Sequence, residues 1–377
     1  MSRETLLMVA DTEHDADMLY AVRLFVPDPF IFFQVNGTPH LVLSDLEIDR
    51  VRHGAPHCRV LSLRQVQEKL RKAGAKKTGF PQVIRHLLQE RRVKKIVVPH
   101  HFPFGLAREL RDLNVKVKPH PGHVFPEREI KTPEEVKKIS AALTMAEVGL
   151  AEGIQALTVS KVDRKRRIIY RGNPLTSEKL RAIIDTAVLQ AGGLPCNTIV
   201  AGGRQSCDPH ERGHGPLRAH EPIILDVFPR SQKTGYFGDI TRTVVKGRAS
   251  EALLKLYHTV KGAQEVAFKS LRNKVNAAAV HQQVVEFFEN EGYKTGKRRG
   301  RLQGFFQGTG HGVGLEIHEA PRVSPKSPDL LRSGHVVTVE PGLYYPELGG
   351  GVRLEDMALV TTNGPRNLTK FEKTLEV

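Results

Sequence analysis

Residues 308–321, GTGHGVGLEIHEAP, combine four glycines at alternate positions with two histidines seven residues apart. A glycine-rich segment can cradle a phosphate, or it can form one wall of a reactive site. Dinucleotide-binding loops need Gly-x-Gly-x-x-Gly, and phosphate-binding loops end in Gly-Lys-Ser/Thr. Neither motif is present, because Val313 stands where a third glycine is needed and no lysine follows. The segment therefore directs attention to the chemistry of His311 and His318.

Four carboxylates occur in strand-like apolar runs of the second half of the chain. Asp226 ends one run, Asp239 begins another, Glu340 ends a third and Glu355 lies in a fourth. A carboxylate surrounded by Ile, Leu and Val is costly to bury unless it is paired or binds a cation. Each has an ordinary explanation alone, since Asp239 could cap a turn and Glu355 could pair with Arg353. Together, arranged as two hairpins, the four predict a metal cage.

The composition of this cage indicates which ions it would hold. Carboxylates with a single imidazole suit Mn, Co, Fe or Zn. Four carboxylates also carry enough charge for two divalent ions about 3.5 to 4 Å apart with a hydroxide between them. His311 would complete the set. A spacing of seven places the ring of His318 on the opposite side of a regular strand, so we expect the chain to bend there and His318 to face substrate.

The first third of the chain alternates strand-like and helix-like segments, as an α/β domain does. Asn36-Gly37 lies between two apolar runs and predicts a hairpin, because both turn positions favour positive φ. Further strands are expected at residues 22–30 and 94–104, with a helix at 63–74 between them.

Prolines and charges interrupt the pattern at residues 118–135, where a domain boundary is expected. Thr132-Pro133-Glu134-Glu135 predicts a capping box that opens a long amphipathic helix. Other helices are expected at 180–188, after Ser250 and around 280–288, with strands between them. The predicted domains are residues 1–125 and 126–377.

Composition excludes several classes of protein. With 377 residues, 40% of them hydrophobic and 26% charged, the chain is expected to be a two-domain globular protein. No apolar stretch is long enough for a membrane span. Three cysteines without a CxxC pair favour reduced thiols and a cytoplasmic location. The net charge of +16 would suit nucleic acid, but it is dispersed, and the basic runs at 161–167 and 294–301 lack interleaved aromatics.

Four motifs, GDITRT, GTGHGVGLEIHEAP, TVEPGLY and GVRLED, occur in this order in the second half of the chain. In these motifs the chain resembles the pita-bread metallopeptidases, and more closely their proline-specific branch of aminopeptidase P and prolidase. The resemblance extends over essentially the whole chain. It implies an α/β protein, with a creatinase-like α/β domain at the N-terminus followed by a pita-bread α+β catalytic domain.

The resemblance also implies a role for each metal ligand. Asp226 would chelate one metal, and Asp239 and Glu355 would bridge both. His311 and Glu340 would complete the second site. A metal-bridging hydroxide would attack the carbonyl before proline while Glu340 moves the proton. Manganese is the expected ion, with cobalt, zinc or iron as alternatives, and a homodimer is expected.

Other residues would act on the substrate according to the same resemblance. His318 and His210 would hold the oxyanion or the carbonyl on the proline side, although His214 lies close enough in sequence to compete with His210 for that role. Arg353 could orient the ligands or meet a substrate carboxylate. The chain departs from the family where Val227-Phe228-Pro229 follows Asp226, since a small residue and glycine are usual there.

The expected function is a dinuclear metallo-exopeptidase that hydrolyses the bond preceding proline, acting on dipeptides or longer peptides. The alternatives are an enzyme like methionine aminopeptidase and a catalytically silent homologue that binds peptides or nucleic acid. The extra N-terminal domain and GVRLED count against the first. Retention of all five ligand positions counts against the second, and also against a metal-free creatine amidinohydrolase. Proline-containing peptides are therefore the expected partners, and neither nucleic acid nor a membrane is.

Overall fold

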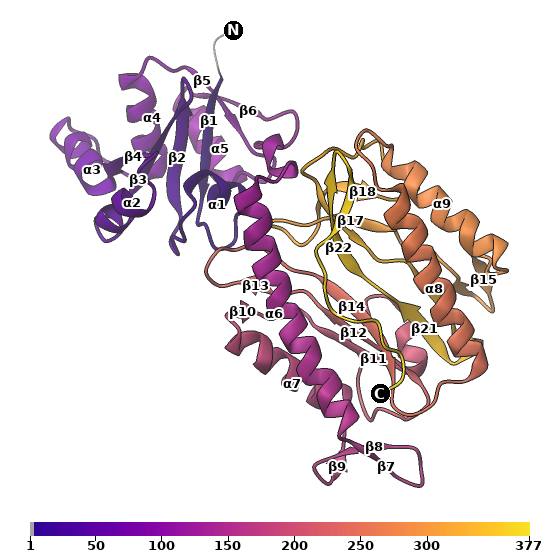
Figure 1. Ribbon diagram of the computed structural model, residues 1–377. Helices are drawn as coiled ribbons and strands as arrows, with labels where there is room; N and C mark the ends of the chain where they lie inside the picture. Colours follow the sequence, from indigo (N-terminus) through magenta and orange to yellow (C-terminus); the bar gives the residue numbers. More distant parts are fainter. Residues whose placement is uncertain (1–3) are drawn as a thin grey trace. The chain divides into compact units, whose positions relative to one another are not determined.

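A computed structural model describes residues 4–377, which divide into two units, Met1–Arg128 and Glu129–Val377 (Figure 1). The first unit is built on a six-stranded sheet of order β4-β3-β2-β1-β5-β6. Its strands are β1 (Thr5–Ala10), β2 (Phe30–Val35), β3 (Thr38–Leu43), β4 (Arg59–Ser62), β5 (Lys95–Val98) and β6 (Lys116–Pro119). Its helices are α1 (Ala16–Val22), α2 (Ile48–Gly54), α3 (Leu63–Lys72), α4 (Phe80–Glu90), α5 (Phe104–Asp112) and the 3-10 turn η1 (Pro126–Glu129).

Both faces of this sheet are buried, because alternate residues of the central strands pack in two separate cores. Phe30 and Phe32 pack with α1 and α2 on one face, whereas Ile31 and Phe33 pack with α3, α4 and α5 on the other. The predicted hairpin is confirmed, with positive φ at Asn36 and Gly37 between the antiparallel strands β2 and β3.

The predicted strand at residues 22–30 is wrong. Val22 ends α1, Arg23 caps that helix with a φ of 61°, and the chain stays irregular until Phe30 begins β2. Pro27 and Pro29 have no N–H to contribute to a sheet, which explains why this apolar run forms no strand. The strand expected within 94–104 and the helix expected at 63–74 are present as β5 and α3.

The second unit contains four long helices and several small sheets. The helices are α6 (Pro133–Thr158), α7 (Ser177–Gln190), α8 (Glu251–Ser270) and α9 (Ala277–Asn290), with the 3-10 turns η2 (Gly203–Cys207) and η3 (Pro346–Leu348). The shorter strands are β7 (Lys161–Val162), β8 (Ile168–Tyr170), β9 (Asn173–Pro174), β10 (Gly193–Leu194), β13 (Arg230–Ser231), β15 (Gly296–Arg298) and β16 (Arg301–Gln303). The strands around the site are β11 (Ile199–Gly202), β12 (Pro222–Val227), β14 (Ile240–Val245), β17 (Gly310–Gly312), β18 (Glu319–Val323), β19 (Val336–Val339), β20 (Gly342–Tyr345), β21 (Gly350–Arg353), β22 (Asp356–Thr361) and β23 (Gly364–Asn367).

Two sheets of this unit, β11-β12-β14 and β18-β17-β19-β22-β23, lie between two helix pairs (Figure 1). Helix α6 packs on α7 and on β12 and β14, while α8 packs on α9 and on β19 and β21. The predicted capping box is confirmed, because Thr132 and Glu135 each accept a hydrogen bond from the other's backbone N–H. It fixes the start of α6, the longest helix of the described chain.

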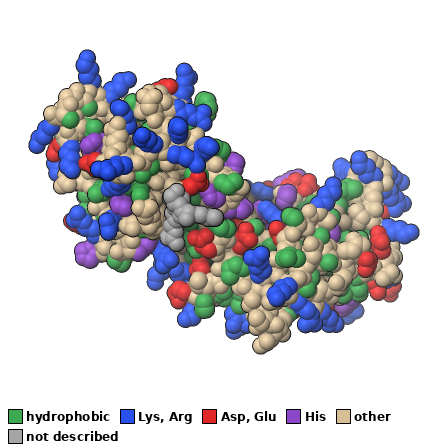
Figure 2. Space-filling view, turned by 90° about the horizontal axis from the view of Figure 1, so that it is seen from above, with side chains coloured by type: hydrophobic (Ala, Val, Ile, Leu, Met, Phe, Trp, Pro, Cys, Tyr) green, Lys and Arg blue, Asp and Glu red, His purple; other side chains and the backbone are tan. Residues whose placement is uncertain are grey.

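No helix among residues 4–377 is long and apolar enough to cross a membrane. The three cysteines are unpaired in the structure. Lys and Arg side chains are dispersed among other side chains on the face drawn in Figure 2, instead of gathering in one patch. On that face the Lys and Arg side chains therefore form no single positively charged patch that could bind an anionic ligand.

Candidate metal centre

Neighbouring strand ends place the four predicted carboxylates together. Asp226 lies in β12 opposite Thr241 of β14, and Asp239 immediately precedes β14. Glu340 follows β19 and Glu355 precedes β22, two strands that pair with each other. An isolated bridge between Thr241 and Glu355 joins the two sheets. In an antiparallel pair the end of one strand lies beside the start of the other, so the four positions lie close together.

His311 enters from β17, which lies between β18 and β19. The structure gives a packing reason for two of the glycines around it. A Cβ at Gly310 would overlap the carbonyl oxygen of Thr338, and one at Gly312 would overlap that of Ala320. The two positions are glycine because the neighbouring backbone approaches too closely for any side chain.

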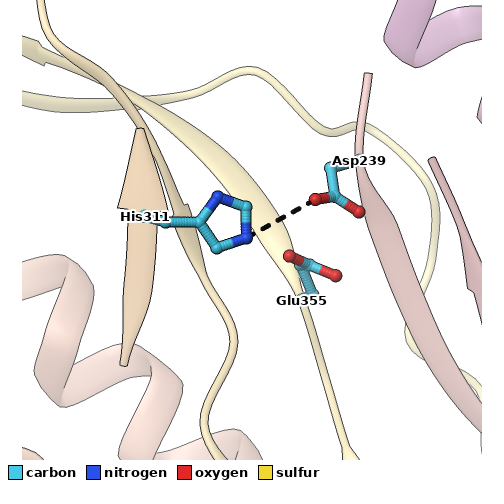
Figure 3. Close-up of side chains that lie close together, drawn as sticks. All are labelled: Asp239, His311 and Glu355. Carbon is cyan, nitrogen blue, oxygen red and sulfur yellow. Dashed lines mark ion pairs between the residues drawn. The ribbon is translucent and has the colours of Figure 1, made fainter. Parts of the chain in front are cut away.

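Asp239, His311 and Glu355 form a buried cluster whose ligand atoms all lie within 4.8 Å of one another (Figure 3). The imidazole points at the two carboxylates, and its Nε2 lies 3.7 Å from Oδ2 of Asp239. The same Nε2 lies 3.2 Å from Oε1 of Glu340. One nitrogen thus faces several carboxylate oxygens at once, as the donor set of a cation site does.

The charges of this cluster are poorly compensated by the protein alone. Asp239 is 4% exposed and Glu355 is 2% exposed. Among the described residues, no group hydrogen-bonds to Oδ1 of Asp239 or to Oδ1 of Asp226. Burial, followed by repulsion from neighbouring carboxylates, raises the pKa of both Asp239 and Glu355 well above the usual range. Orphaned buried oxygens of this kind fit one or more bound cations, which would satisfy them and lower these pKa values.

Asp226 and Glu340 are better compensated. Oδ2 of Asp226 accepts a hydrogen bond from the Arg353 guanidinium at 2.7 Å. The sequence left open whether Arg353 would pair with Glu355, but Glu355 instead accepts a bond from the Thr241 hydroxyl at 2.7 Å. Burial opposes the charged form of Glu340, yet the hydrogen bond and positive charge of His311 outweigh it and lower the pKa of Glu340.

A cavity of about 700 Å³ opens above the cluster, and its lining includes all five predicted ligand residues. His318 and His210 also line it, whereas His214 is exposed outside it, 3.6 Å from Glu211. Of the two candidates from the sequence, the structure thus places His210 at the cavity. Phe228, part of the unusual segment after Asp226, contributes to the wall.

The chain bends between His311 and His318 as expected, since β17 ends at Gly312 and β18 begins only at Glu319. The two rings lie edge to face with centroids 4.4 Å apart. His318 is exposed to the cavity, yet desolvation by the surrounding protein, followed by the charges of His311 and Arg322, lowers its pKa to about 4. Its ring is therefore neutral near pH 7 and presents one N–H and one free nitrogen.

Several residues that support the site were missed by sequence reasoning. The Thr338 hydroxyl donates to Glu340 at 3.1 Å and accepts the backbone N–H of His311. Thr241 and Thr338 each lie two residues from a carboxylate along a strand, as Arg353 does, and alternate strand residues share a face. That period of two could have identified Thr241 and Thr338, whereas Arg353 was predicted from the sequence. By contrast, the hydrogen bond from Arg353 to Tyr344 at 3.0 Å has no local signal.

Arg322 was also missed. It lines the cavity, and its guanidinium forms no ion pair or hydrogen bond with another described residue. Its backbone N–H donates a hydrogen bond to Oδ2 of Asp329 at 2.8 Å. It stands four residues after His318 and is available to a ligand.

The raised pKa values predict how the metal-free protein responds to pH. Asp239 and Glu355 bind a proton more tightly in the folded chain than in the unfolded one, where their pKa values are about 4. Their contribution is therefore most favourable below about pH 4, and stability is lost as pH rises towards the raised folded values. After removal of metal, we expect Asp239→Asn to be more stable than the unsubstituted protein, by a margin that grows from about pH 5 to about pH 8. Thermal unfolding of both chelator-treated proteins measures this margin, and a margin independent of pH would contradict the assigned burial of charge.

Residues 137–362 match the model of metallopeptidase family M24. Two similar relatives are named Xaa-Pro dipeptidase. That of Pyrococcus horikoshii is 31% identical over 286 residues, which cover 75% of this chain and 75% of the relative. That of Pyrococcus furiosus is 33% identical over 249 residues, covering 66% of this chain and 65% of the relative.

Solved structures of similar fold extend over both units. A dipeptidase from Pyrococcus horikoshii superposes with a TM-score of 0.79 at 26% identity, covering 100% of this chain and 96% of the other. An X-Pro aminopeptidase from Thermotoga maritima superposes with a TM-score of 0.83 at 22% identity, covering 99% and 97% of the two chains. The second likeness is evidence for the fold alone.

Proposed function

Because this chain belongs to metallopeptidase family M24, we propose that it is a metal-dependent exopeptidase that hydrolyses the peptide bond preceding proline. The observation that carries the proposal is the set of buried, undercompensated carboxylates and His311 on the lining of a cavity that His318 and His210 also reach. A binding module has no need for such a set, which is costly to bury.

The family is metal-dependent, and the donor set fits divalent ions, of which we expect two, with manganese first and cobalt, zinc or iron as alternatives. The residues that would hold them are Asp226, Asp239, His311, Glu340 and Glu355. When bound, such ions lower the pKa of water and polarise a carbonyl group. Within the protein, Thr241 and Arg353 orient Glu355 and Asp226 by the hydrogen bonds described above.

Glu340 is the residue we assign to proton transfer. Its Oε1 accepts from Thr338 at 3.1 Å and its Oε2 from the Gln307 amide at 3.3 Å, so the carboxylate is fixed at the cavity surface. In that position it accepts a proton from the attacking water and returns it to the leaving nitrogen of proline. A single group can act as both base and acid because the two transfers are sequential.

His318 and His210 are assigned to the substrate carbonyl. The neutral imidazole of His318 donates one N–H to the substrate oxygen on which negative charge develops. The centroid of its ring lies 4.4 Å from that of the His311 ring. His210 approaches the same cavity from the segment after η2. The guanidinium of Arg322, which has no partner among residues 4–377, can meet the carboxylate of a dipeptide substrate.

Specificity for proline rests on the relatives and not on a pocket read from this chain. The two curated relatives described above are named Xaa-Pro dipeptidases, and the cavity has the volume of a small-ligand site. A homodimer and a cytoplasmic location stay predictions.

The experiment is mass-spectrometric product analysis of the protein loaded with Mn or Co and incubated with Ala-Pro, Ala-Pro-Ala and Met-Ala-Ser. We expect alanine to be released from at least one proline peptide and Met-Ala-Ser to stay intact. Cleavage of Ala-Pro alone identifies a dipeptidase, and cleavage of the tripeptide identifies an aminopeptidase. Release of methionine only would favour a methionine aminopeptidase-like enzyme, and no cleavage with metal bound would favour a binding role.

A further inference from the structure

A second cavity of about 590 Å³ adjoins the first one in the same unit. Asp208, Pro209 and Phe306 line both cavities, so the two cavities lie next to each other at these three residues. Arg204 and Arg301 line only the second cavity. A ligand seated over the metal centre can therefore extend past Phe306 towards two guanidinium groups.

The carboxylates of the second cavity are already engaged with backbone N–H groups. Oδ1 of Asp208 accepts the N–H of His210 at 3.1 Å, and Oε1 of Glu211 accepts the N–H of Gly213 at 3.0 Å. Burial, then the nearby charge of Glu347, raises the pKa of the Cys207 thiol to about 12. The thiol is neutral at physiological pH and supplies no negative charge to the cavity.

The guanidinium groups of the cavity are, in contrast, available. Arg204 lies in η2 and Arg301 begins β16, and both side chains are exposed. Neither forms an ion pair or a side-chain hydrogen bond with any residue in the described part of the chain. Arg298, on the same β15–β16 hairpin, is instead occupied by Glu347 at 2.7 Å. The hairpin thus directs one arginine to a protein carboxylate and leaves another facing the cavity.

The direction in which a substrate can extend follows from the proposed function, on which this inference rests. In an exopeptidase that releases the residue before proline, that residue carries the free amino group, so any additional residues follow the proline. Those residues are the part of the substrate that can enter the second cavity. Two unpaired guanidiniums select carboxylate oxygens there, because charge-assisted hydrogen bonds to carboxylates are among the strongest that arginine forms.

We propose that the second cavity is a subsite for peptide residues beyond the proline, and that Arg204 and Arg301 bind a carboxylate on those residues. The preferred substrates are then acidic peptides longer than a dipeptide. The carboxylate comes either from an Asp or Glu side chain or from the end of the peptide chain.

The test compares kcat/KM and binding for three tetrapeptides that distinguish these sources. They are Ala-Pro-Glu-Glu-amide, Ala-Pro-Gln-Gln-amide and Ala-Pro-Gln-Gln with a free carboxyl end. We expect the unsubstituted protein to prefer one or both acidic peptides over the neutral amide by roughly tenfold. In the double variant Arg204→Gln/Arg301→Gln the ratio of kcat/KM for the acidic peptides to kcat/KM for the neutral amide should fall to about one. Arg298→Gln, a matched loss of charge on the same hairpin, should keep it.

The three peptides distinguish a side-chain carboxylate, a chain-end carboxylate and the absence of a subsite. A preference for the glutamate peptide assigns the subsite to a side chain, and a preference for the free acid assigns it to the chain end. Equal kcat/KM for all three peptides, or a preference that survives in the double variant, overturns the subsite. If no peptide is cleaved, equilibrium binding of the same three peptides still measures the preference, so the proposed function can fail while the subsite stands.

Discussion

Asp239→Asn is expected to remove the bound metal and nearly all peptidase activity. The carboxylate is buried, it lies in the cluster with His311 and Glu355, and one of its oxygens has no protein partner in the described chain. Metal-assisted activation of water and carbonyl contributes several kcal/mol to a hydrolytic transition state, which corresponds to roughly a thousandfold in kcat/KM. We therefore expect a loss of at least about that size, with metal content by elemental analysis falling in parallel. Glu355→Gln should behave in the same way.

Asp185→Asn provides the matched control for this prediction. Asp185 is a carboxylate of the same unit whose pKa is also raised by burial. It accepts a hydrogen bond from the Thr198 hydroxyl at 2.6 Å and does not line the cavity. Its substitution should leave metal content and activity unchanged. Retention of metal and activity in Asp239→Asn would show that the cluster is not the metal centre.

His318→Ala is expected to lower kcat by roughly a hundredfold or more while leaving the metal content unchanged. The ring lines the cavity, it is neutral near pH 7 because its pKa is lowered to about 4, and no carboxylate of the cluster is paired with it. Loss of one hydrogen-bond donor to a developing oxyanion typically costs about a hundred- to a thousandfold. Steady-state kinetics with a proline peptide, together with elemental analysis of the same sample, measure both quantities.

His214→Ala is the control for this second prediction, because His214 is exposed outside the cavity beside Glu211. The His214→Ala variant should be fully active, whereas His210→Ala should lose activity as His318→Ala does. Loss of metal from His318→Ala would reassign the residue as a ligand.

The positions of the metal-binding candidates could be predicted from the sequence because they interrupt strong apolar patterns. A carboxylate at the end of a run such as PIILD or VVTVE is conspicuous, since burying its charge is unfavourable without a partner. The same local logic predicted the hairpin at Asn36-Gly37 and the capping box at Thr132. These features depend only on residues a few positions apart.

Features that depend on pairing between distant segments could not be predicted in this way. Arg353 binds Asp226, 127 residues away, because β21 packs near β12 and not because of any spacing in the sequence. The arginines of the second cavity come from η2 and β16, which are also remote from each other in sequence. The expected strand at 22–30 failed for the opposite reason: its apolar pattern was sound, but its prolines exclude sheet pairing.

Anomalous X-ray diffraction from crystals grown with manganese is a direct test of the assigned metal centre, since it locates the ions without reference to activity. We expect two peaks about 3.5 to 4 Å apart, as in other two-metal sites, surrounded by Asp226, Asp239, His311, Glu340 and Glu355. A single peak within this set would correct the number of ions and keep the site. Peaks only elsewhere, or none in crystals of a protein that cleaves proline peptides, would contradict the account.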